Sequence, residues 1–228
     1  MMGKRSYGLI GWLMLLSIVA GCGRAESPQP TAPPVPGWEK FEGGRVELWL
    51  PQSYTGGDLS GEHLALIVEK IRSFGPDFEK VAQAIEQNPS AFVIFAVDSE
   101  VGDSGTVTNM NVVSRRVPST VTVDKYLDIV AKKLPGQYRV LEQGIVPLDH
   151  YQAGRLVLDI EIQGVHLKNV MYAIKNGRTL WTVSYGTGAE EFDQRLPIFE
   201  QSARTFNVRA QPLWLKVVKI LLAKFAGI

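Results

Sequence analysis

The sequence predicts an α+β layered sandwich in which amphipathic helices cover a mostly antiparallel sheet. Three observations lead to this fold class. Several runs between residues 46 and 185 alternate apolar and polar side chains, which is typical of strands. The last four of these runs are hairpin-linked and follow one another without room for helical crossovers, which favours antiparallel pairing. Other stretches show the helical period, and one of them closes the domain.

The first half of this domain is expected to hold two helices between strands. Residues 46–51 alternate as a strand that Pro51 closes. Ser60 is the expected N-cap of a first helix, and Pro76 starts a second that ends at Asn88-Pro89. The apolar positions expected on their inner faces are Leu64, Ile67, Val68 and Ile71, and then Phe78, Val81 and Ile85. Residues 91–97 are apolar on both faces and predict a central strand, with another at 107–113 beyond an acidic loop.

The second half is predicted to be richer in strands. Residues 122–134 form a third amphipathic helix, whose inner positions are Val123, Tyr126, Leu127, Val130 and Leu134. Strands follow at 138–146, 154–162, 165–175 and 178–185, and Asn176-Gly177 is the hairpin signal that joins the last two. A final helix carries Phe192, Leu196, Phe199 and Ala203, and Pro197 should kink it or mark its start. We find no internal repeat and expect one domain.

Composition and charge exclude several classes of protein. Of the 228 residues, 45% are hydrophobic and 21% are charged, which excludes collagen-like, disordered and coiled-coil chains. A formal net charge of +1 lacks the basic field of a general nucleic-acid binder, so we expect no nucleic-acid partner. A single cysteine excludes a disulfide framework and a multi-cysteine metal site.

Residues 1–21 have the features of a lipoprotein signal peptide. Lys4 and Arg5 precede an apolar run at 9–20 that is too short for a stable membrane-spanning helix. Val19-Ala20-Gly21-Cys22 resembles the bacterial lipobox, in which the cysteine sulfur is diacylated and the cysteine becomes the mature N-terminus. The alternative is a cysteine that happens to end an apolar stretch. We expect a palmitate-type lipid anchor at Cys22 and a location on the extracytoplasmic face of a bacterial membrane.

Two segments flank the predicted domain at 37–210. Residues 22–36 are proline-rich and predict an extended linker. Residues 211–228 predict an amphipathic helix with three lysines and no acid, while residues 37–210 hold a net charge of about −4. Such a helix could bind anionic lipid, pack on its own domain, or occupy a groove on a partner. The positions expected to contact a membrane or partner are Trp214, Lys216, Val217, Lys219, Leu221, Lys224 and Phe225.

Four patterns suggest chemistry, but each has a simpler explanation that we favour. Gly102-Asp103-Ser104-Gly105 partly matches a serine-protease loop and fits a polar turn. Gly186-Thr187-Gly188 lacks the rest of a phosphate-binding fingerprint, and its glycines are expected to supply positive φ angles. Weak candidates for a metal site are Asp98, Glu100 and Asp103, which suit a solvated loop. The histidines show no metal-ligand spacing, and we expect no metal, no cofactor and no enzymatic activity.

Three groups of residues within about 37–209 carry a resemblance to a known family. They are Gly37-Trp38-Glu39-Lys40-Phe41 with 46–51, then Asn109-Met110-Asn111-Val112-Val113 followed by Pro118 and the 122–134 helix, and finally the 172–185 hairpin, the 192–203 helix and residues 202–208. Together they resemble the PsbP-like family of photosystem II extrinsic proteins. The resemblance implies an α/β/α sandwich and a non-catalytic binding or assembly role. The lipobox departs from the founding member and suits a bacterial lipoprotein, and the tail after Arg209 is additional.

These observations predict a membrane-tethered extracytoplasmic binding or assembly protein that acts on a membrane or envelope partner. The alternative is a lipoprotein hydrolase or small-ligand-binding protein whose pocket is built from residues distant in sequence. A pocket with a histidine beside a carboxylate and a serine would favour the hydrolase, whereas a flat or apolar groove would favour binding.

Overall fold

A computed structural model describes residues 35–100, 102, 104–162 and 164–209 of the chain. The predicted signal peptide, Cys22, most of the 22–36 linker, Asp103 and the predicted 211–228 helix lie outside the described residues. None of the helices in the described part is long and apolar enough to cross a membrane.

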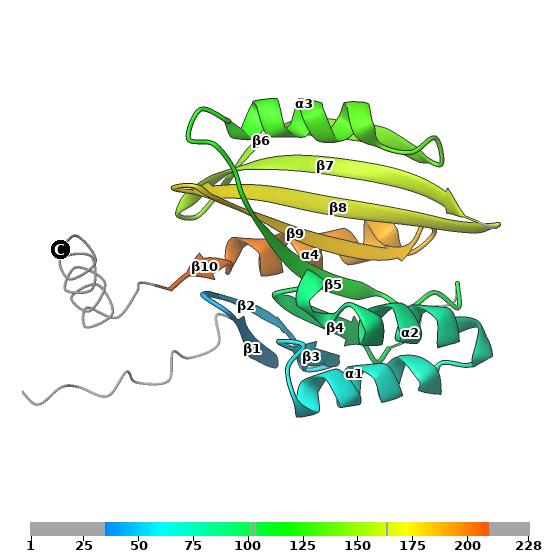
Figure 1. Ribbon diagram of the computed structural model, residues 1–228. Coiled ribbons are helices and arrows are strands. Elements are labelled where there is room, and N and C mark those ends of the chain that lie inside the picture. The colour runs from blue at the N-terminus through cyan, green and yellow to red at the C-terminus, as the bar shows by residue number, and fades with distance from the viewer. Residues whose placement is uncertain (1–34, 101, 103, 163, 210–228) are drawn as a thin grey trace, which may run out of the picture. The chain divides into compact units, whose positions relative to one another are not determined.

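A seven-stranded sheet forms the centre of the domain, and every neighbouring pair in it is antiparallel (Figure 1). Its strand order is β3-β4-β5-β9-β8-β7-β6. The strands are β3 (Tyr54–Gly57), β4 (Ile94–Asp98), β5 (Asn109–Arg116), β6 (Tyr138–Leu148), β7 (Tyr151–Ile162), β8 (Val165–Asn176) and β9 (Thr179–Gly188). Strands from residues 54–98 and from residues 109–188 therefore share one sheet.

A second, smaller sheet joins the two ends of the described chain. It has the order β1-β2-β10 and consists of β1 (Trp38–Gly43), β2 (Val46–Pro51) and β10 (Asn207–Val208). Side-chain hydrogen bonds strengthen this closure, since Trp49 N donates to Thr205 Oγ1 at 2.8 Å and Ser202 Oγ donates to the Trp49 carbonyl at 2.6 Å.

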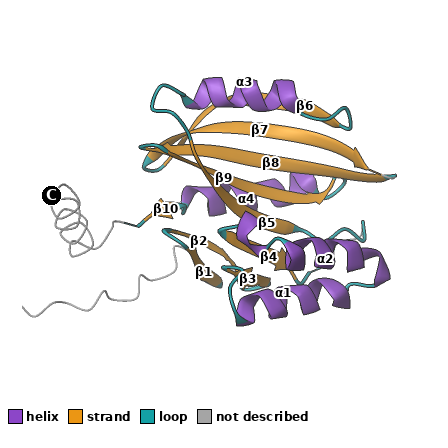
Figure 2. Cartoon of the chain, in the orientation of Figure 1, coloured by secondary structure: helices purple, strands orange, loops and turns teal. Residues whose placement is uncertain are grey.

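The helices cover both faces of the large sheet (Figure 2). They are α1 (Glu62–Ser73), α2 (Glu79–Gln87), α3 (Val123–Lys133) and α4 (Phe192–Arg204), with short 3-10 helices at Pro76–Phe78 and Pro89–Ala91. The register aligns Phe95 with Met171 and Leu156 across the strands, so these residues share one face. Helices α1 and α2 pack over Phe95, and α3 packs over Leu156 and Met171. The opposite face is covered by α4 and the small sheet.

The largest core cluster lies between the large sheet, α4 and the small sheet. Four aromatic side chains in it are at most 2% exposed, namely Tyr172, Tyr185, Phe199 and Phe206. Tyr185 stacks on Phe199 with ring centroids 5.1 Å apart, and its hydroxyl donates to Ser202 Oγ at 2.9 Å. Burying an aromatic side chain of this kind contributes about 1.5–3 kcal/mol, so α4 is held to the sheet by its apolar face.

The predicted α+β fold class is confirmed, and so are the 122–134 and 192–203 helices, the fully buried strand within 91–97 and the hairpin at Asn176-Gly177. Strands β1, β3 and β10 were not among the predicted strand runs, and the layer that contains α4 also includes the small sheet.

Two local predictions were wrong. Ser60 is not the N-cap of α1, because its hydroxyl donates to Asp58 and Gly61 takes that position. Val81 is 48% exposed, since Ala82 and Ile85 fill the inner face of α2. Of the two roles predicted for Pro197, the structure excludes the start of the helix, because Pro197 lies inside α4, which begins five residues earlier at Phe192.

Candidate functional site

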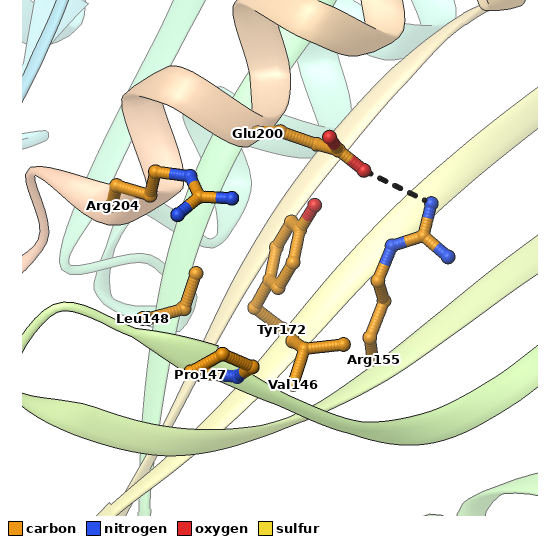
Figure 3. Close-up of a pocket in the computed structure, with 7 residues that line it drawn as sticks. All are labelled: Val146, Pro147, Leu148, Arg155, Tyr172, Glu200 and Arg204. Atoms are coloured by element: carbon orange, nitrogen blue, oxygen red, sulfur yellow. Dashed lines mark hydrogen bonds and ion pairs between the residues drawn. The ribbon is translucent and has the colours of Figure 1, made fainter.

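A pocket of about 320 Å³ lies between α4 and the strands β6, β7 and β8 (Figure 3). We call it the α4 pocket. Its apolar wall is three consecutive residues of the edge strand β6, Val146, Pro147 and Leu148. Its polar groups are Arg155 from β7, Tyr172 from β8, and Glu200 and Arg204 from α4.

Strand register and helical spacing bring these polar groups together. Arg155 pairs with Tyr172 across β7 and β8, so the two side chains point to the same face of the sheet. Glu200 and Arg204 are one helical turn apart, and therefore lie on one side of α4. Figure 3 shows the Tyr172 hydroxyl pointing toward α4, between the guanidinium groups of Arg155 and Arg204.

Arg155 is the most highly connected group of the pocket. Its guanidinium forms two ion pairs. Nη1 lies 2.5 Å from Glu142 Oε2, and Nη2 lies 3.3 Å from Glu200 Oε1. Only 13% of its side chain is exposed, and its buried Nε donor has no hydrogen-bond partner among the described residues. The two ion pairs fix the guanidinium while leaving this N–H group without an acceptor in the described part of the chain.

Tyr172 is the second incompletely bonded group. The residue is 1% exposed, yet its hydroxyl has no hydrogen-bond partner within residues 35–209 as the structure describes them. Burial raises the pKa of this hydroxyl, and the nearby Arg155 guanidinium partly opposes the rise, so the group stays protonated at neutral pH. A buried hydroxyl without a partner costs free energy, which an acceptor atom in the pocket would recover.

Arg204 supplies the remaining charge. Its residue is exposed, and no ion pair joins it to another residue of the described chain. The pocket therefore combines a fixed donor at Arg155, a buried donor at Tyr172 and a cation at Arg204 beside an apolar wall. This arrangement can hold a ligand that presents acceptor oxygens next to an apolar group.

The predicted polar turn around Ser104 is a structural feature. Ser104 Oγ donates to Glu191 Oε1 at 2.5 Å, and Ser104 N donates to the same oxygen at 3.0 Å. Burial alone would raise the pKa of Glu191, but the bonds from Ser104 and Arg195 outweigh it and hold that pKa below its usual value. The serine thus anchors its loop to α4, with a carboxylate rather than a histidine as its partner.

Asp98 and Glu100, two of the weak metal candidates, contact an arginine. Asp98 is 3% exposed, and its Oδ2 lies 2.7 Å from Arg195 Nη1, while Arg195 Nη2 donates to the Glu100 carbonyl at 3.1 Å. A guanidinium therefore neutralises the Asp98 carboxylate. Among the described residues, no three His, Cys, Asp or Glu side chains form a group that could hold a metal ion.

Gly186-Thr187-Gly188 ends strand β9 instead of forming a loop. The expected positive φ angles are wrong, because neither glycine has one. Gly188 is needed for close packing, since a β-carbon there would collide with the Ser104 side chain, and Thr187 Oγ1 lies 2.7 Å from Thr108 Oγ1.

The histidines are near acids at the surface. In an open polar depression of about 550 Å³, His166 Nε2 lies 2.5 Å from Asp159 Oδ1, and the other oxygen of that carboxylate, Oδ2, lies 2.7 Å from Arg139 Nη2. No serine is among the described residues that line this depression. His63 Nδ1 lies 2.7 Å from Asp58 Oδ1, and His150 is exposed in the β6–β7 turn.

Sequence reasoning did not identify the residues of the α4 pocket. Arg155 occupies the polar position of an alternating strand, which predicts solvent rather than a covered site. One feature of the sequence could have indicated the pocket: Glu200 and Arg204 are one turn apart on the last helix, beside its apolar stripe.

No family model and no curated protein sequence matches this chain. Similar solved structures include cyanobacterial PsbP (CyanoP) from Synechocystis sp. PCC 6803, with 13% identity, 80% of this chain and 98% of that chain covered, and a TM-score of 0.48. A second is LpqN, involved in cell envelope biogenesis of Mycobacterium tuberculosis, with 9% identity and a TM-score of 0.49; the match covers 76% of this chain and 92% of LpqN. A third is the immunity protein TplEi of the Pseudomonas aeruginosa T6SS, complexed with "L" peptide, with 10% identity and a TM-score of 0.43; the match covers 77% of this chain and 99% of TplEi. These likenesses concern the fold, in which this chain is similar to PsbP, the protein that gives its name to the family noted in the sequence.

Proposed function

We propose that this chain is a lipid-anchored extracytoplasmic protein whose folded domain binds an envelope partner at the α4 pocket without transforming it. One observation carries the binding role. The pocket presents two buried donors, Tyr172 OH and Arg155 Nε, that have no partner in the described part of the chain and lie next to an apolar wall. Unsatisfied buried donors at an open pocket favour a bound acceptor group.

The anchor in this proposal is Cys22, and the linker at 22–36 separates it from the domain. Fifteen residues in an extended, proline-rich conformation reach roughly 45 Å at about 3.1 Å each. That reach would hold the domain near the bilayer while leaving its surface accessible. Two or more acyl chains on one residue are sufficient for stable membrane attachment.

The anchor is tested by labelling cells with an alkyne analogue of palmitate and comparing the natural chain with Cys22→Ala. We expect label and membrane fractionation for the natural chain, and loss of label for the variant. An unlabelled natural chain that keeps residues 1–21 would contradict the proposal.

The binding role is tested in the same cells by a photo-crosslinking amino acid at position 147, an exposed residue of β6 that lines the α4 pocket and carries no charge. A matched control places the same amino acid at Arg116, an exposed position on β5 outside the pocket. We expect a discrete crosslinked species from position 147 that Tyr172→Phe weakens. Equal crosslinking from both positions would refute a role for the pocket.

We further propose that the 211–228 helix binds the membrane surface. The contacts would come from Trp214, Lys216, Val217, Lys219, Leu221, Lys224 and Phe225, which combine apolar and cationic side chains. Cosedimentation of Cys22→Ala protein with anionic vesicles should fall when 211–228 is deleted. If cosedimentation is unchanged and the melting temperature drops, the helix belongs to the core.

A further inference from the structure

We propose that the α4 pocket recognises a single carboxylate group attached to a short apolar group. The inference rests on the proposed binding function and names the chemistry of the ligand. Three features of the pocket carry it: the number of free donors, the balance of charge, and the apolar wall.

The free groups of the pocket are donors. Arg155 Nε–H can only donate, and Tyr172, whose hydroxyl has no partner among the residues that the structure describes, lies beside it across the β7–β8 pair. A group with two adjacent acceptor oxygens can receive a bond from each of them. A carboxylate meets this requirement, and hydrogen bonds to an ionised acceptor are stronger than neutral ones.

The balance of charge favours a ligand with one negative charge. The residues that line the pocket include two guanidinium groups, Arg155 and Arg204, and one carboxylate, Glu200, so the lining carries a net charge of +1. Glu142, which pairs with Arg155 Nη1, is not among these lining residues. Arg204 brings the one guanidinium of the pocket with no ion pair to another described residue. A monoanion would neutralise Arg204, whereas a phosphate dianion would leave an excess negative charge beside Glu200.

The apolar wall and the volume limit the rest of the ligand. Val146, Pro147 and Leu148 present hydrophobic surface, which suits an aliphatic side chain next to the carboxylate. A volume of about 320 Å³ is at the lower end of the range for small-molecule pockets, so one such group fills much of it.

Two sources share this chemistry: a free aliphatic carboxylate and the C-terminal residue of a protein partner. The second source has a path to the pocket, because its apolar wall belongs to β6, the last strand of the large sheet. An extended chain can lie along such an edge and end between β6 and α4.

The experiment uses the purified full chain, labelled with ¹⁵N, and follows the Arg155 Nε–H signal by NMR. The probes are N-acetyl-leucine, its neutral amide N-acetyl-leucinamide, and hexanoate. We expect N-acetyl-leucine to shift the signal and to bind at least about tenfold more tightly than the amide. Binding of hexanoate with similar strength indicates a free carboxylate as the natural ligand, and its failure to bind indicates a protein C-terminus.

Two variants test the named donors. Tyr172→Phe removes only the hydroxyl and should weaken N-acetyl-leucine about tenfold. Arg204→Gln, at an exposed position, should weaken it by a similar factor and abolish most of its salt dependence, while Arg116→Gln should leave it unchanged. Should Tyr172→Phe fail to fold, Arg204→Gln decides the question on its own.

The proposal is overturned if the acid and its amide bind equally, if both pocket variants bind like the natural chain, or if no probe shifts the Arg155 signal. The crosslink from the pocket reports a bound partner whatever its chemistry. A persistent crosslink without a response to the acid therefore overturns the ligand inference alone, whereas equal crosslinking from both positions overturns the proposed function.

Discussion

Replacing Arg195 with methionine should destabilise the domain through two carboxylates left without a cation. The guanidinium lies 2.7 Å from Asp98 Oδ2 and 3.2 Å from Glu191 Oε2, and Asp98 is only 3% exposed. Methionine retains much of the apolar stem, so the loss is mainly electrostatic. Removing one partner of a buried ion pair costs about 3–5 kcal/mol. Because 15% of the Arg195 side chain reaches solvent, we expect the lower end of that range.

The assay is urea-induced unfolding of the full chain at pH 7, followed by tryptophan fluorescence and by far-ultraviolet circular dichroism. A loss of about 3 kcal/mol corresponds to a melting temperature lower by roughly 6–12 °C in a domain of this size. The matched control is Arg72→Met, whose ion pairs with Glu79 and Glu86 are at the surface, and which should change stability little. Equal losses for the two variants would refute the argument that burial makes the Arg195 network important.

Three further outcomes are expected. The pKa of Glu191 is lowered, so its contribution to stability is present above the unfolded value of 4.5 and is lost as the pH falls below it. Glu191→Gln should therefore flatten the acid limb of a stability-against-pH curve, and an unchanged limb would contradict this. Gly56→Ala places a β-carbon against the Phe95 carbonyl and should cost about 1–3 kcal/mol. Gly144→Ala, which meets nothing within 4 Å, should not lower the urea midpoint. Tyr185→Phe removes the bond to Ser202 and should cost about 1 kcal/mol in the same assay.

The long strands and helices were predictable because their apolar residues repeat with one period and face one core. The alternation of β2 and the inner face of α3 are examples, with Val46, Leu48, Leu50, Tyr126 and Leu127 all buried. The missed strands lack such a pattern. β3 ends in two glycines, which usually indicate a turn, and β10 has two residues. Their pairing depends on neighbours far along the chain, which local periodicity does not contain.

The α4 pocket was less predictable than the fold. Arg155 and Tyr172 are 17 positions apart, and only the register of β7 and β8 places them side by side. Helix α4 lies over this position, so only 13% of the Arg155 side chain is exposed although the alternation of β7 predicts that it faces solvent. Residues that pattern analysis did select, such as Ser104 and Asp98, proved to tie the β4–β5 loop to α4. These sequence patterns thus indicated residues that form polar contacts, but they did not distinguish a catalytic or binding role from a structural one.

The small sheet has a consequence for when folding can finish. Strand β2 is flanked on one side by β1 and on the other by residues 207 and 208, and Trp49 is bonded to side chains at 202 and 205. Contacts that span more than 150 positions form late, because the intervening chain must first be ordered. A ribosome-bound chain that has not yet released residues 207 and 208 still lacks the third strand of the small sheet, so the nascent polypeptide stays incompletely closed until synthesis is nearly finished.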